Sequence, residues 1–148
     1  MKYTDFLKTI KTCPFCARPT DEILLESEKA FVTYAIAPYH KHHLLVIPKR
    51  HFSSFIEITT EEMSEIDILQ RKALDILHNL GYKNVSFLVR DGDGSGKSIE
   101  HLHYHVIPDV FLGDMGHSIA DRPVMTETEC LESFEDLKNA LSSLDKKL

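Results

Sequence analysis

The sequence lacks any apolar run approaching the roughly 20 residues that a membrane-spanning helix requires. Its first residues also lack the apolar stretch of a secretory signal peptide. No internal repeat, linker or low-complexity tract interrupts the 148 residues. We therefore expect a cytoplasmic protein with no membrane partner.

An excess of positive charge is also missing. Seventeen lysines and arginines stand against 23 aspartates and glutamates, which gives a formal net charge of -6. Binding along a nucleic-acid backbone needs a dense basic face, so we expect no nucleic-acid partner. The length and the 43% hydrophobic content suit one globular domain spanning residues 1–148.

Cysteine is scarce, and its odd count of three does not suit a framework of disulfides. Cys13 and Cys16 form a Cys-Pro-Phe-Cys pair, which in a reducing cytosol indicates metal or redox chemistry. A glutaredoxin-type redox pair needs a helix after it, and Pro19 and Thr20 argue against a long helix there. Plain buried thiols are a third interpretation, and Cys130 is expected to be a small core residue.

Apolar periodicity predicts an α+β domain, with a small sheet and helices against it. Thr59 begins a capping box for a long helix that Gly81 ends, and Thr126 begins a C-terminal helix within residues 123–148. The predicted strands cover residues 23–26, 30–36, 43–48, 85–90 and 101–108, and a short helix is predicted over residues 3–11. The apolar positions expected on the C-terminal helix are Leu131, Phe134, Leu137, Leu141 and Leu144.

Three histidines alternate along the last predicted strand, at positions 101, 103 and 105. Successive side chains of a strand point to opposite faces, so the three imidazoles share one face, with neighbours roughly 7 Å apart. Leu102, Tyr104 and Val106 then face the core. Neutral imidazole is a good nucleophile, so one ring could attack a substrate while its neighbours orient it or hold a metal. A polar outer face that happens to be histidine is the alternative.

The loop before these histidines, residues 90–98, is rich in glycine and has two partial likenesses. A P-loop would place its first glycine at Asp91 and would continue into a helix, where a strand is expected here. An EF-hand loop would need a calcium ligand at its twelfth position, which is Leu102. A flexible hairpin connection fits the glycines but not the basic residues Arg90 and Lys97.

Residues 101–107, His-Leu-His-Tyr-His-Val-Ile, match the His-φ-His-φ-His-φ-φ signature, and the sequence resembles the histidine-triad superfamily. The run of residues 43–49 and the loop of residues 92–98 extend this resemblance over residues 13–108. The resemblance implies a HIT-like fold, with about five antiparallel strands, a long helix and a C-terminal helix. It also implies a homodimer whose sheets join.

The same resemblance implies a nucleotide hydrolase. His103 would attack the α-phosphorus of a nucleotide and form a covalent nucleotidyl-histidine. His105 and His43 would act as cationic donors to the phosphate oxygens. The residues expected to bind the substrate are Ser98, Gly96, Lys97 and Arg90, with the loop amides close to phosphate.

Zinc-bearing branches of the superfamily use two cysteines and two histidines at corresponding places. The resemblance therefore implies one structural zinc ion held by Cys13, Cys16, His51 and His101. This metal would tie an N-terminal zinc-binding segment, residues 1–20, to the sheet.

The sequence departs from the family at several positions. Ala35 stands where many members carry an aspartate that binds ribose, and His42 replaces a glycine. Arg90 and Lys97 add positive charge near the leaving group, partly offset by Asp109. This charge favours a substrate with extra phosphates, such as a diadenosine polyphosphate. Four further histidines are expected to be solvated: His40, His42, His78 and His117.

Three other functions stay open. A nucleotidyl transferase or phosphorylase would use another acceptor in place of water, and a phosphoramidate hydrolase would cleave a different bond at the same phosphorus. A protein of another class, a zinc-stabilised nucleotide-binding module with little turnover, would bind nucleotides without cleaving them.

Overall fold

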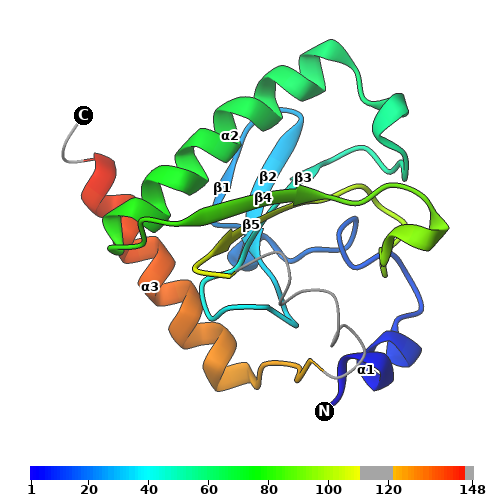
Figure 1. The fold of residues 1–148 in the computed structure, drawn as a ribbon, viewed down its shortest axis with the longest axis horizontal. Helices are drawn as coiled ribbons and strands as arrows, with labels where there is room; N and C mark the ends of the chain where they lie inside the picture. Colours follow the sequence, from blue (N-terminus) through cyan, green and yellow to red (C-terminus); the bar gives the residue numbers. More distant parts are fainter. Residues whose placement is uncertain (111–121, 146–148) are drawn as a thin grey trace.

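Five strands form one antiparallel sheet in the computed structural model, in the order β1-β2-β3-β5-β4 (Figure 1). The structure describes residues 1–110 and 122–145, so the prediction for His117 lies outside the described residues. The strands are β1 (Leu25–Glu26), β2 (Ala30–Tyr34), β3 (Leu44–Pro48), β4 (Val85–Val89) and β5 (Tyr104–Pro108). The helices are α1 (Tyr3–Thr9), α2 (Thr60–Asn79) and α3 (Glu127–Asp145). This architecture confirms the expected α+β class with a long helix and a C-terminal helix.

Each central strand is buried on both of its faces. In β2 and β3, alternate residues such as Val32 and Val46 join a large core with α2 and α3, whereas Phe31 and Leu45 join a smaller core. The smaller core includes Phe15 from the N-terminal segment. The period of two therefore divides the strand residues between two layers, and the alternating histidines lie on the side of the smaller core.

The long helix α2 covers one face of the sheet, and α3 packs beside it (Figure 1). Thr59 and Glu62 form both hydrogen bonds of the predicted capping box, and Gly81 follows the helix with a φ of 99°. In α3, Phe134 and Leu137 are buried as expected, but Leu131 is 60% exposed. Leu131 shares the helical spacing of these buried residues but lies outside the packed side of α3.

The N-terminal segment covers part of the opposite face of the sheet. Lys2 forms an isolated antiparallel bridge with Pro123, and the amide of Tyr3 donates to the carbonyl of Arg122. Figure 1 shows α1 (blue) close to the segment that leads into α3 (orange). The N-terminal segment and the segment that leads into α3 are thus brought together.

The last strand begins later than the sequence predicted. β5 starts at Tyr104 rather than at residue 101, because Leu102 donates its amide to the carbonyl of Phe52 instead of to a neighbouring strand. The division of the side chains is nevertheless as predicted. Leu102, Tyr104 and Val106 lie in the large core, and Phe15 on the other side contacts the rings of both His101 and His103.

His42 is buried, which corrects the expectation that it is solvated. Its exposed fraction is 8%, and its ring is hydrogen-bonded to the Tyr82 hydroxyl at 2.7 Å and to the Asp136 carboxylate at 2.9 Å. These contacts join the turn before β3 to α3. None of the described helices is both long enough and apolar enough to cross a membrane.

The homodimer stays a prediction, and the structure suggests where to test it. Among the described residues, β4 pairs only with β5, and Phe87 on β4 is 45% exposed. An open sheet edge with an exposed aromatic residue is suited to strand pairing with a second copy. We expect Phe87→Lys to convert the dimer to a monomer in light scattering coupled to gel filtration.

Leu131→Lys on α3 is the matched control, because it also replaces an exposed apolar side chain, and it should leave the dimer intact. A parent protein that is already monomeric would contradict the predicted assembly.

Candidate active site and metal centre

His103 presents one ring nitrogen to a cavity and binds the backbone with the other. Its Nδ1 lies 2.7 Å from the carbonyl oxygen of His101, so Nδ1 carries the proton and donates it to that carbonyl. Nε2 is therefore unprotonated, with its lone pair free to attack an electrophile. This is the tautomer that a nucleophilic histidine needs.

His43 and His105 form a directed pair of rings beside it. The amide of Tyr39 donates to Nδ1 of His43, at 3.2 Å, so the proton of the neutral His43 ring sits on Nε2. That Nε2–H donates to Nδ1 of His105, at 2.9 Å. Because Nδ1 of His105 accepts this bond, the one ring proton of neutral His105 is on Nε2. Nε2–H can then donate to a bound group.

All three rings are held in their neutral form. Burial, followed by the charge of Arg122, lowers the pKa of His43 to about 3. Burial also lowers the pKa of His103 to about 4, and that of His105 well below its usual value. The role of His43 and His105 as donors to phosphate stays a prediction, and their lowered pKa values favour neutral rings over cationic ones before substrate binds. As neutral rings, they donate through the N–H groups that the hydrogen-bond chain fixes.

The cavity in front of His103 is lined by cations and not by carboxylates. Among the described residues that line it, four are basic, and none is an aspartate or glutamate, although the chain carries a formal charge of -6. The basic residues are Arg18, Arg90, Lys97 and Arg122. Such a lining favours an anionic ligand.

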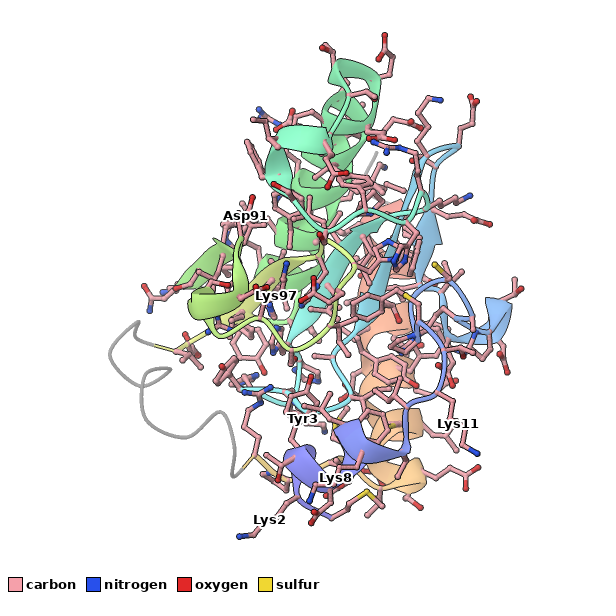
Figure 2. The ribbon with its side chains drawn as sticks, turned by 90° about the vertical axis from the view of Figure 1, so that its right-hand side faces the viewer. Lys2, Tyr3, Lys8, Lys11, Asp91 and Lys97 are labelled. Carbon is pink, nitrogen blue, oxygen red and sulfur yellow. The ribbon has the colours of Figure 1, made fainter. Side chains whose placement is uncertain are left out.

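Three of the four substrate-binding residues expected from the sequence line the cavity, and the fourth does not. Arg90, Lys97 and Ser98 line the cavity, whereas Gly96 lies outside this lining, on the exposed side of the loop. Lys97 is only 3% exposed and pairs with Glu100 at 3.3 Å, so its charge is already partly balanced. Figure 2 shows Lys97 on the loop between β4 and β5, and Tyr3 on α1.

Sequence reasoning missed three residues of this cavity region: Tyr3, Tyr39 and Arg122. The Tyr3 hydroxyl lies 2.6 Å from the Ser98 hydroxyl, which ties α1 to the glycine-rich loop. Arg122 lines the cavity because the segment before α3 pairs there with the N-terminal segment. No local pattern marks these residues, since their position depends on contacts between distant parts of the chain.

The predicted metal ligands come together at the other end of the histidine segment. One ligand atom from each of Cys13, Cys16, His51 and His101 lies within 4.8 Å of all the others, so the cluster could hold a metal ion. The ring of His101 donates its Nε2–H to the carbonyl of Pro48, at 2.7 Å, which leaves Nδ1 unprotonated toward the cluster. His101 is fully buried, and its pKa is lowered by burial, as suits a neutral ligand.

The spacing within the cluster fits one tetrahedral ion. Bond lengths of about 2.3 Å to sulfur and 2.0–2.1 Å to nitrogen place sulfur and nitrogen ligands about 3.5 Å apart, and two nitrogen ligands about 3.3 Å apart. The observed sulfur–nitrogen distances are 3.4 Å for Cys13–His101, 3.3 Å for Cys16–His51 and 3.5 Å for Cys16–His101. The nitrogen–nitrogen distance between His51 and His101 is 3.2 Å. Four protein ligands leave no open position for a substrate.

Comparison with known proteins identifies related chains. The HIT domain family model matches residues 18–111. An uncharacterized HIT-like protein of Methanocaldococcus jannaschii is 30% identical over 65% of this chain and 78% of its own length. Adenosine 5'-monophosphoramidase of Schizosaccharomyces pombe is 31% identical, over 66% and 74%. Bis(5'-adenosyl)-triphosphatase of Dictyostelium discoideum is 30% identical, over 59% of each chain.

Solved structures share the fold. A zinc-bound histidine triad family protein of Mycobacterium smegmatis has a TM-score of 0.72 and 24% identity, over 93% of this chain and 98% of its own. A histidine triad nucleotide-binding protein of Sulfolobus tokodaii has a TM-score of 0.74 and 24% identity, over 92% and 96%. These similarities confirm the HIT-like fold that the sequence resemblance implied.

The metal centre can be tested through the cysteines. We expect the purified protein to contain about one divalent ion per chain, measured by plasma mass spectrometry, and Cys16→Ser to lose most of it because a thiolate ligand is removed.

Cys130→Ser is the matched control, since this third cysteine lies in α3, outside the cluster. It should keep the metal content of the parent. Equal metal content in Cys16→Ser and Cys130→Ser would exclude the cluster as the binding site.

Proposed function

Because the chain belongs to the HIT domain family, we propose that it is a nucleotide hydrolase in which Nε2 of His103 attacks the α-phosphorus of the substrate. The observation that carries this proposal is the hydrogen bond from Nδ1 of His103 to the carbonyl of His101. It directs the lone pair of the other nitrogen into a cavity lined by cations. A buried imidazole in that tautomer, facing an anion site, is suited to phosphoryl chemistry.

The reaction takes place in two steps. In the first, a bond forms between Nε2 of His103 and phosphorus, and the bond from phosphorus to the leaving group breaks with its electron pair. In the second, a water oxygen attacks the phosphorus and the bond from phosphorus to Nε2 breaks, with its electron pair returning to the ring. The water gives up a proton to solvent, and a nucleoside monophosphate is released. Nε2–H of His105 and the hydroxyl of Ser98 are placed to donate to the phosphate oxygens in both steps.

The substrate we propose is a dinucleoside polyphosphate such as diadenosine triphosphate. A phosphate leaving group departs as an anion and is stabilised by nearby cations, whereas an amine leaving group needs a proton. The cavity supplies the cations Arg90 and Arg122 for a phosphate leaving group. Its histidines are poor proton donors to an amine, because their lowered pKa values disfavour the protonated form. Support also comes from the Dictyostelium relative, which carries the name bis(5'-adenosyl)-triphosphatase.

We further propose that the metal is zinc with a structural role. Two thiolates and two imidazoles at tetrahedral spacing are a preferred zinc ligand set. The Mycobacterium smegmatis protein of the same fold is zinc-bound. Zinc at this site would fix His101, whose carbonyl in turn holds the ring of His103.

The reaction is tested with diadenosine triphosphate in water enriched in ¹⁸O. Attack at the α-phosphorus through His103 predicts AMP and ADP as products, with one ¹⁸O in the AMP and none in the ADP. His103→Asn should lower the rate at least about a thousandfold, because removing a nucleophile abolishes the covalent route.

His78→Asn is the control, since His78 is an exposed residue of α2. It should leave the rate unchanged.

Cleavage that persists in His103→Asn would overturn the assignment of the nucleophile. Product formation only in the presence of added phosphate or another acceptor would indicate a phosphorylase or transferase. Faster turnover of adenosine phosphoramidate would reverse the substrate preference. A parent protein that binds nucleotides but cleaves none would be a binding module.

A further inference from the structure

Two arginines meet at one tyrosine hydroxyl beside the proposed active site. Nη1 of Arg122 donates to the Tyr39 hydroxyl at 3.0 Å, and Nη2 of Arg90 donates to the same oxygen at 3.3 Å. Within residues 1–110 and 122–145, neither arginine forms an ion pair with a carboxylate. Two like charges are thus held close together with no counter-anion from the described part of the chain.

Arg122 is fixed in place before any ligand arrives. Its guanidinium lies between two aromatic rings, 4.5 Å from the centre of Tyr3 and 4.4 Å from that of Tyr39. Nε donates to the carbonyl of Ala37 at 2.7 Å. A guanidinium has five N–H donors, and the bonds to described residues use two of them. The other three form no hydrogen bond to the described residues, and Arg122 lines the cavity where an anion could accept from them.

The arginine pair lies at the far end of a row of rings that starts at the nucleophile. The ring centres of His103 and His105 are 4.9 Å apart, those of His105 and His43 are 5.1 Å apart, and those of His43 and Tyr39 are 5.7 Å apart. A phosphate bonded to His103 meets His105 and Ser98 first. Contact with Arg122 requires negative charge further along the substrate.

We propose that Arg90, Tyr39 and Arg122 form a phosphate clamp that binds the phosphate groups of the leaving group. This inference rests on the proposed function and specifies how that site selects a nucleotide anhydride. The two guanidinium groups supply paired donors to phosphate oxygens, and Tyr39 sets their separation. Tyr39 and Arg90 lie within the residues that match the family model, and Arg122 follows them in the chain.

Substrate comparison tests the clamp. Arg122→Gln should lower kcat/KM for diadenosine triphosphate by about 10- to 100-fold, the loss typical of a charged hydrogen-bonding group. The same change should alter kcat/KM for adenosine phosphoramidate less than about twofold, because that substrate has no second phosphate. Arg71→Gln, which removes an exposed arginine of α2, should change neither value. Equal losses on both substrates would overturn the clamp, since Arg122 would then bind the phosphate that both share.

Binding separates failure of the clamp from failure of the proposed reaction. In the His103→Asn background, calorimetry should show ADP binding at least about tenfold tighter than AMP. Adding Arg122→Gln should close this gap by weakening ADP alone. A gap that survives Arg122→Gln contradicts the clamp whether or not the parent protein cleaves nucleotides. If Arg122→Gln lowers Tm strongly, Tyr39→Phe keeps the ring stacking and removes only the shared hydroxyl. Tyr39→Phe should reduce the difference in affinity between ADP and AMP. An unchanged difference in that variant also overturns the proposal.

Discussion

The hydrogen bond from the ring of His103 to the carbonyl of His101 is the contact on which the site depends. It joins the predicted metal cluster to the proposed nucleophile through a single residue. The His101 ring reaches the cluster through Nδ1 and the Pro48 carbonyl through Nε2, while its backbone oxygen fixes the tautomer of His103. Binding of a structural metal contributes to folding free energy wherever its ligands are fixed only in the folded chain. If the cluster holds the proposed zinc ion, the same free energy supports the orientation of the ring that we propose as the nucleophile.

Much of the fold could be predicted because burial leaves a periodic trace in the sequence. The capping residues Thr59 and Thr126 marked both long helices, and the alternation after His101 divided that strand correctly between its two faces. Strand ends were less predictable, since β5 begins only where the backbone finds a partner strand, at Tyr104. The sequence pattern describes the side chains but not which carbonyl each amide meets.

The site was predicted only in part, for a related reason. The metal ligands and the alternating histidines could be predicted because they lie in short motifs that resemble those of a family. Arg122 and Tyr3 reach the cavity through the bridge between Lys2 and Pro123, a contact between residues more than a hundred positions apart. The lowered pKa of His43 also has no local signal in the sequence, because it arises from burial and from the charge of Arg122.

Different segments of the chain supply the histidines and the residues around the arginine pair. The strands within the family match hold the histidines, whereas segments on both sides of that match supply Tyr3 and Arg122. Because Arg122 is immobilised between two rings, its side-chain entropy is lost on folding and not on binding, which favours tight anion binding. Electrostatic repulsion between Arg90 and Arg122 lowers the stability of the unliganded protein. An anion that bridges them relieves this repulsion, so ligand affinity and the stability of the liganded protein rise together.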